Sequence, residues 1–139
     1  MTVKDGLRWL LTVTMIWIGV KHFTGPDFFV SIMPDYLPWH LELVYLSGVF
    51  EILGGLGLAY APTRRFSAFG LIALYVAVFP ANIHMAVNDI PLASGEHLHP
   101  AMLWGRLFFQ PVFIAWAYWF TLPDVAAEEG PGSAVGSKL

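Results

Sequence analysis

The chain is organised around residues 79–88, which read Phe79-Pro80-Ala81-Asn82-Ile83-His84-Met85-Ala86-Val87-Asn88. These residues end an apolar run that begins near Phe66 and is long enough to cross the hydrocarbon core of a bilayer. Three hydrogen-bonding side chains and a helix-breaking proline therefore sit at the end of a membrane-length segment. Polar groups in hydrocarbon cost free energy, so the stretch predicts a membrane helix whose polar side chains find partners or serve a function.

The composition of the whole chain agrees with a lipid environment. Its 139 residues are 57% hydrophobic and only 12% charged, whereas a soluble domain has about 25% charged residues. The net charge of −3 argues against a nucleic-acid partner, because such proteins need a basic surface to neutralise phosphates. Cysteine is absent, which excludes disulfides, thiolate nucleophiles and cysteine-held clusters. Any redox role would need a bound cofactor or a partner.

Four apolar runs are long enough to be spanning helices: residues 7–23, 43–61, 66–87 and 101–122. Prolines interrupt the chain between the first two runs and leave a short apolar segment, residues 28–33, which we expect at the bilayer interface. The predicted fold class is all-α: a polytopic membrane protein with an antiparallel four-transmembrane-helix bundle and a short interfacial segment between helices 1 and 2. Residues 1–123 form this domain, and residues 124–139 have the composition of a disordered cytoplasmic tail.

The positive charges predict the orientation. Basic residues flank the start of the first run and fill the second loop: Lys4, Arg8, Arg64 and Arg65. The first and third loops contain no Lys or Arg. Cytoplasmic loops carry the excess of positive charge, so both termini are expected in the cytoplasm.

With this orientation, the unusual polar residues of the runs fall in the outer half of the bilayer. We predict that they line a common ligand-binding pocket: His22, Glu51, Asn82, His84, Asn88, Arg106 and Gln110. No residue is assigned a catalytic role, and no spacing of His or carboxylate residues indicates a metal site.

Each of these residues also has a purely structural interpretation. Glu51 would then form a buried ion pair, with Arg106 as the preferred partner and Lys21 as the second choice. The histidines would be satisfied at helix interfaces near the headgroups. The amides of Asn82 and Gln110 would form interhelical hydrogen bonds.

Six short motifs cover nearly the whole chain apart from the tail: Gly19-Val20-Lys21-His22-Phe23, Phe29-Val30-Ser31-Ile32-Met33-Pro34, Tyr36-Leu37-Pro38-Trp39, Leu46-Ser47-Gly48-Val49-Phe50-Glu51, Phe79-Pro80-Ala81-Asn82-Ile83-His84-Met85-Ala86 and Trp104-Gly105-Arg106-Leu107-Phe108-Phe109-Gln110. With these motifs the chain resembles the DoxX-like family of small four-helix bacterial membrane proteins. It departs from that family where relatives often carry a proline before the glutamine of the last motif, because here Pro111 follows Gln110.

The resemblance implies a membrane subunit of the kind associated with quinone-linked sulfur oxidation or with oxidative-stress complexes. It implies no catalytic residues, because most members of the family have no assigned reaction. The leading hypothesis is therefore a small membrane subunit that binds a lipid-soluble ligand, with a quinone as the candidate cofactor, and serves a redox-linked membrane complex. Its partners would be the lipid bilayer and either another membrane protein or further copies of the chain.

Two alternatives use the same features differently. Small-residue faces suit a non-enzymatic scaffold that helps a membrane complex to assemble. Polar groups within the membrane also suit a transporter of a small solute, which four short helices would form only as an oligomer. The residues alone do not decide whether the protein is an enzyme.

Overall fold

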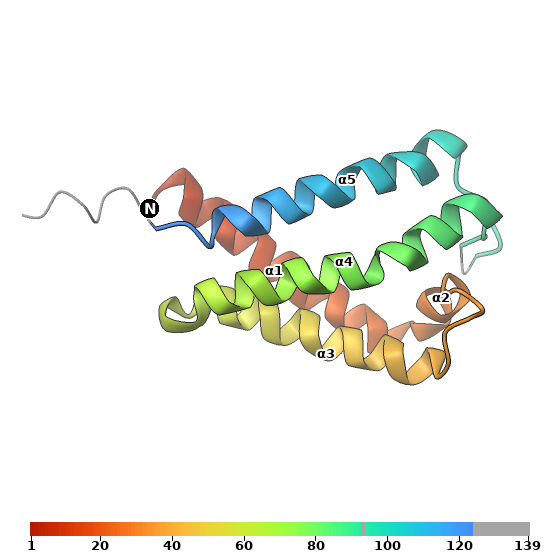
Figure 1. Cartoon of the computed structure of the whole chain (residues 1–139), viewed down its shortest axis with the longest axis horizontal. Coiled ribbons are helices and arrows are strands. Elements are labelled where there is room, and N and C mark those ends of the chain that lie inside the picture. The colour runs from red at the N-terminus through yellow and green to blue at the C-terminus, as the bar shows by residue number, and fades with distance from the viewer. Residues whose placement is uncertain (93, 124–139) are drawn as a thin grey trace, which may run out of the picture.

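A computed structural model describes residues 1–92 and 94–123, and their regular structure is all-helical, as the sequence predicted (Figure 1). The longest helices have 20 to 25 residues: α1 (Val3–Thr24), α3 (His40–Ala59), α4 (Arg64–Asn88) and α5 (Pro100–Trp119). A six-residue helix, α2 (Pro26–Ser31), and a 3-10 turn, η1 (Ala61–Thr63), complete the described elements. The predicted disordered tail, residues 124–139, lies outside the described residues.

Local hydrogen bonds explain where α1 begins and ends. The Asp5 N–H donates to the Thr2 hydroxyl at 3.1 Å, and the Thr2 N–H donates to the Asp5 carboxylate at 3.0 Å, which forms a capping box. At the other end, the Gly25 N–H donates to the Lys21 carbonyl at 2.9 Å. Pro26 follows at the first position of α2, where its missing N–H costs nothing. Helix α2 therefore begins at Pro26, two residues before the apolar segment 28–33 that the sequence predicted.

A tight turn joins α3 to α4 and makes the two helices antiparallel neighbours. The Thr63 hydroxyl lies 3.0 Å from the Gly57 carbonyl and donates to it. Nε of Arg64 donates to the Leu58 carbonyl at 3.3 Å. Both bonds satisfy carbonyls that the last turn of α3 would otherwise leave without donors.

Glycines bring α1 and α3 into backbone contact. A Cβ atom on Gly19 of α1 would lie 2.8 Å from the Gly48 carbonyl oxygen of α3. One on Gly55 would lie 2.9 Å from the Thr12 carbonyl oxygen. Helices approach this closely only where both surfaces lack side chains, as in small-residue contacts of membrane helices. We call this contact the glycine seam.

The other helices follow α3 in a simple order (Figure 1). α4 packs against α3, and α5 packs against α4. Within the described residues, the backbone of α1 does not come close to that of α4 or α5. The space between α1 and these two helices is therefore wider than the space across the glycine seam, and side chains have to fill it.

Two apolar clusters fill the interior at different heights. The larger one joins α1, α3, α4 and the end of α5 through buried residues that include Leu11, Leu58, Leu71 and Phe120. The smaller one, near α2, is built from Ile32, Met85, Ala86 and Leu103. Residues of both clusters border the space between them: Met15 and Tyr75 from the larger one and Ile32 from the smaller one.

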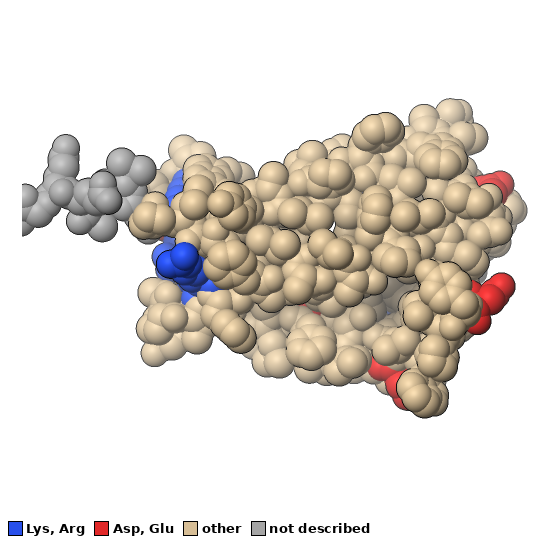
Figure 2. Space-filling view, viewed as in Figure 1, with Lys and Arg blue, Asp and Glu red and all other residues tan. Residues whose placement is uncertain are grey.

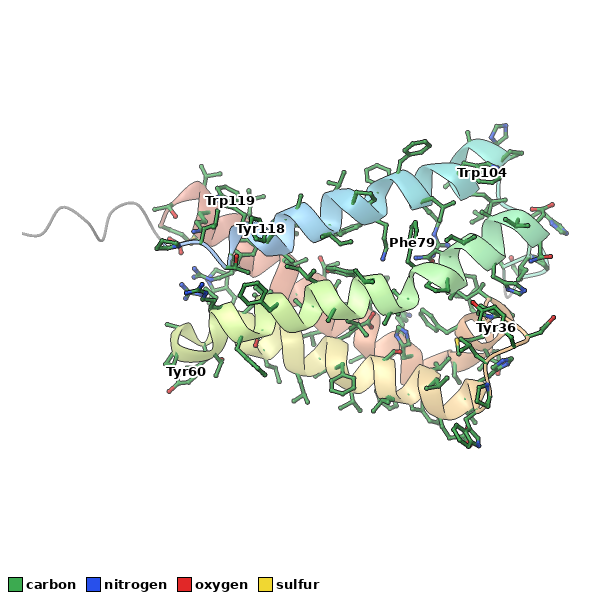
Figure 3. The ribbon with its side chains drawn as sticks, viewed as in Figure 1. Tyr36, Tyr60, Phe79, Trp104, Tyr118 and Trp119 are labelled. Carbon is green, nitrogen blue, oxygen red and sulfur yellow. The ribbon has the colours of Figure 1, made fainter. Side chains whose placement is uncertain are left out.

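The outer surface is apolar along the helices and charged at the two ends. Two segments are long and apolar enough to cross a membrane, His40–Ala59 and Ala61–Asn88. Figure 2 shows Lys and Arg at the end that holds the N-terminus, Asp and Glu at the opposite end, and mostly uncharged surface between them. Figure 3 places Tyr60, Tyr118 and Trp119 near the basic end and Tyr36 and Trp104 near the acidic end.

Candidate functional site

A cavity of about 470 Å³ opens between the helices, in the half of the molecule that contains α2. Its walls are mostly apolar: Met15, Ile18, Phe29, Ile32, Met33, Val44, Val78, Ala81, Phe109 and Phe113. Its polar lining consists of His22, Ser47, Glu51, Tyr75, Asn82, Arg106 and Gln110. The structure therefore brings five of the seven predicted site residues to one cavity, because three antiparallel helices and the end of α1 present them at the same height. That they bind a ligand stays a prediction.

Glu51 lies against His22, and the predicted pairing with Arg106 or Lys21 is wrong. Oε2 of Glu51 is 3.1 Å from Nδ1 of His22, and these side chains are 10% and 7% exposed. The same Nδ1 lies 2.9 Å from the Ile18 carbonyl, one helical turn earlier. A single N–H cannot align with both acceptors, and Oε2 of Glu51 is buried without a hydrogen bond. The Glu51 carboxylate and the His22 ring are thus in contact without a satisfied hydrogen bond.

The glycine seam explains why a histidine reaches Glu51. A Cβ atom on Gly48, one turn before Glu51, would lie 2.7 Å from Cβ of His22. Lys21 is rotated by about 100° around α1, since each helical residue turns by that angle. Its side chain is exposed, and its ammonium lies 5.4 Å from the centre of the Trp17 ring. His22 instead stacks on Phe29 of α2, with 3.8 Å between the ring centres.

Arg106 is the cation of the cavity, and no described carboxylate lies within ion-pair distance of it. Nη1 donates to the sulfur of Met85 at 3.3 Å, and the guanidinium carbon lies 5.9 Å from the centre of the Phe28 ring. A thioether is a weak acceptor, and a guanidinium has five N–H donors that it does not lose by deprotonation. Most of the donors of this half-buried cation therefore remain available to an acceptor in the cavity.

Asn82 and Gln110 join α4 to α5, as their structural interpretation predicted. Nδ2 of Asn82 donates to Oε1 of Gln110 at 3.0 Å, and Nε2 of Gln110 donates to the Tyr75 carbonyl at 2.9 Å. Pro80 lies between these two contacts and has no N–H, so it interrupts the hydrogen-bond ladder of α4 there. The amides therefore stabilise an interrupted helix while they also form one wall of the cavity.

His84 and Asn88 do not line the cavity, so the prediction of a pocket common to all seven residues is wrong for these two. Nδ1 of His84 lies 3.1 Å from the Ile32 carbonyl, and Nδ2 of Asn88 donates to the His84 carbonyl at 2.9 Å. His84 is turned by about 200° from Asn82 on a helix, and Pro80 does not bring the two to the same face. His84 thus connects the end of α4 to the segment after α2, whereas the bond of Asn88 lies within α4.

Sequence reasoning missed Tyr75 as a polar residue of the cavity. Its hydroxyl donates to the sulfur of Met15 at 3.1 Å, and both residues are buried. The signal was present, because a tyrosine in the middle of an apolar run lies far from water and its hydroxyl needs a partner inside the protein.

The cavity thus combines an apolar body with two unsatisfied groups of opposite character. Glu51 offers a buried carboxylate oxygen that lacks a donor, and Arg106 offers donors that lack a strong acceptor. Such a site suits a small molecule that is largely apolar and carries hydrogen-bonding groups at its edge. Within residues 1–92 and 94–123, no three His or carboxylate side chains are grouped to hold a metal ion.

The family model described as "Domain of unknown function (DUF8561)" matches residues 11–121. The matched span contains every residue that lines the cavity. No curated protein and no solved structure matches the chain.

Proposed function

The chain belongs to the DUF8561 family of domains of unknown function, and we propose that it is an integral membrane protein that holds a lipid-soluble ligand in its cavity. A quinone is the candidate ligand. The protein would be a four-helix transmembrane bundle in the bacterial inner membrane, with both termini in the cytoplasm and α2 at the outer interface. It would serve a redox-linked membrane complex, together with a protein partner or further copies of itself.

Exposed apolar side chains on α1 and α5 support the inclusion of these helices among the spans. Val13 and Trp17 on α1 are more than half exposed, and so are Phe108 and Val112 on α5. In water such surfaces would be large exposed apolar patches, whereas in a bilayer they face lipid. Tyrosine and tryptophan side chains near both ends of the helices suit the two interfaces of a bilayer (Figure 3).

The separation of charges supports the proposed orientation. Four basic residues gather at the end with the N-terminus and the α3–α4 turn (Figure 2): Lys4, Arg8, Arg64 and Arg65. Lys21 and Arg106 lie toward the other end. Cytoplasmic ends of membrane helices carry such an excess of Lys and Arg. The cavity would then lie in the outer half of the bilayer.

One observation carries the ligand proposal: Oε2 of Glu51 is buried without a hydrogen bond, in a cavity that Arg106 also lines with no described carboxylate within ion-pair distance. A cluster that served only packing would direct donors of Arg106 to this oxygen, because a buried polar atom without a hydrogen bond costs free energy. Here both groups face a volume of about 470 Å³, which lies within the range of about 300–1,000 Å³ that small-molecule sites occupy.

A quinone fits the chemistry of the two groups. Its ring and tail are apolar, and its carbonyl oxygens accept hydrogen bonds of the kind that Arg106 has available. Reduction of a quinone to a quinol takes two electrons and two protons. The partner complex would supply the electrons, and Glu51 and His22 are suited to exchange the protons with the ring oxygens.

The resemblance to the DoxX-like family belongs to the same proposal. The motifs that carry this resemblance also supply polar residues of the cavity: His22, Ser47, Glu51, Asn82, Arg106 and Gln110. A quinone-linked role would therefore draw on the part of the chain in which the resemblance is concentrated.

The test is to purify the full chain in mild detergent and to identify co-purified lipids and quinones by mass spectrometry. The variant Ala81→Phe places a ring in the cavity and should remove the ligand, because Ala81 lines this space. The matched control is Ala77→Phe, one turn earlier on α4, where the alanine is exposed and does not line the cavity. If wild-type protein carries no such molecule, or if both variants lose it equally, the cavity is not its site and the scaffold alternative is favoured.

A further inference from the structure

A second, smaller pocket lies at the basic end of the molecule. It has a volume of about 220 Å³, and basic side chains from two helices line it: Lys4 and Arg8 of α1, and Arg64 and Arg65 of α4. The buried ring of Phe120, just after α5, forms part of its wall. Three segments that are distant in the sequence thus build one concave basic surface.

Arg8 is the most buried of these side chains, at 10% exposure. Its Nη1 donates to the Asp5 carboxylate at 2.6 Å, but its Nε is buried and has no hydrogen-bond partner among the described residues. The Thr2 backbone N–H, the Thr2 hydroxyl and the Arg8 guanidinium hold the pKa of Asp5 down at about 2, so this carboxylate is ionised at neutral pH. Asp5 therefore balances the charge of Arg8, while Nε of this arginine keeps a donor without an acceptor among the described residues.

The two arginines of α4 line the same pocket. Nε of Arg64 donates to the Leu58 carbonyl at 3.3 Å, and the guanidinium of Arg65 lies 6.0 Å from the centre of the Phe69 ring. No described carboxylate lies within ion-pair distance of either guanidinium. No side chain caps the first turn of α4, where the helix dipole also favours an anion.

We propose that this pocket binds the phosphate of an anionic phospholipid. Guanidinium groups bind phosphate oxygens through paired hydrogen bonds, and basic pockets between membrane helices on the cytoplasmic side bind lipid headgroups. The apolar wall at Phe120 and the exposed side chain of Leu122, which also lines the pocket, provide contacts for the lipid beyond its headgroup. The site rests on the proposed membrane location but not on the identity of the ligand in the larger cavity.

The experiment measures the thermal unfolding midpoint of the full chain in detergent as phosphatidylglycerol, phosphatidylcholine or inorganic phosphate is added. Phosphatidylglycerol should raise the midpoint, and the other two should not. In the double variant Arg64→Gln/Arg65→Gln the apparent affinity should fall about 25-fold, because each basic residue near the headgroups contributes about fivefold. Both side chains are partly exposed, so this variant is expected to fold.

Three controls separate this site from other causes. Lys21→Gln removes an exposed cation at the opposite end and should leave the response unchanged. Ala81→Phe alters only the larger cavity and should also leave it unchanged, which keeps this test independent of the quinone proposal. A variant with Asp124→Asn, Glu128→Gln and Glu129→Gln tests whether carboxylates of the chain itself compete for the pocket.

Several results would overturn the proposal. An equal response to phosphatidylcholine would show that headgroup charge is irrelevant, and an equal response to inorganic phosphate would show a site for free anions. Equal loss in Lys21→Gln and in the arginine variant would show an effect of overall charge. A response that occurs only after the three carboxylates are neutralised would show that the pocket is held by the chain itself.

Discussion

The two sides of α1 differ in how closely other helices approach them. On one side, glycines of α1 and α3 let the backbones touch, and a single methyl group at Gly19 would lie 2.8 Å from the Gly48 carbonyl oxygen. On the other side, α1 and α5 stay apart and border a cavity of about 470 Å³. Both sides are built from similar apolar residues, so the difference comes from where the small residues lie. The glycine seam positions His22 beside Glu51, and the space on the other side leaves both facing a cavity.

The largest effect is expected from a side chain placed in the glycine seam. Gly19→Ala should destabilise the protein by about 2–3 kcal/mol, because the new methyl group meets backbone that cannot rotate away. The measurement is the free energy of unfolding in detergent. Gly70→Ala is the control: no atom lies within 4 Å of a Cβ there, and replacing a mid-helix glycine gains about 0.5–1 kcal/mol. Equal effects of the two substitutions would show that the seam is not tight.

A smaller effect is expected where the seam meets the cavity. Glu51→Gln and His22→Gln should show a coupling of about 0.5–3 kcal/mol in a double-mutant cycle, because the two side chains are in direct contact. The same cycle with Lys21→Gln in place of His22→Gln should be additive within about 0.5 kcal/mol. Coupling to Lys21 as large as that to His22 would restore the pairing expected from the sequence.

On the cavity side, the amide contacts between α4 and α5 should contribute less. Gln110→Leu removes two interhelical hydrogen bonds, each worth about 0.6 kcal/mol in a membrane protein, so a loss of about 1 kcal/mol in unfolding free energy is expected. Phe108→Leu, on the exposed face of the same helix, should change stability by less. A loss of several kcal/mol for Gln110→Leu would mean that the interrupted part of α4 around Pro80 depends on this side chain.

The smallest effect on the ligand is expected from His84→Ala. His84 does not line the cavity, so the amount of co-purified ligand should stay within about twofold of wild type, and one hydrogen bond of about 1 kcal/mol should be lost. Mass spectrometry of the purified variant measures the first quantity, and thermal unfolding measures the second. Loss of ligand as complete as in Ala81→Phe would place His84 in the binding site after all.

The order of the helices along the chain was predictable because its signals are local. Gly25-Pro26 separates α1 from α2, and Pro62 accompanies the turn before α4. Apolar runs of membrane length mark α3 and the segment Ala61–Asn88. Such signals depend on neighbouring residues only, since a proline lacks its N–H in any fold and an apolar run needs burial in lipid or protein.

The candidate site was only partly predictable. Height in an antiparallel bundle follows from position along each helix, which is why His22, Glu51, Asn82, Arg106 and Gln110 could be grouped from the sequence. The rotation of each helix about its axis does not follow from height. Because of that rotation, His84 and Asn88 do not line the cavity. Tyr75, five residues before Pro80, does line it.

The sequence by itself determined an all-helical chain, the order of its helices, which segments are apolar enough to cross a membrane, and at what height along the helices the polar residues lie. Only the tertiary structure decided that Glu51 meets His22, that Arg106 has no carboxylate partner among the described residues, and that a cavity remains between them. The physical reason is that local hydrogen bonds and hydropathy act between neighbours. Which faces of two helices meet depends instead on contacts between residues that are distant in the sequence, such as Gly19 and Gly48.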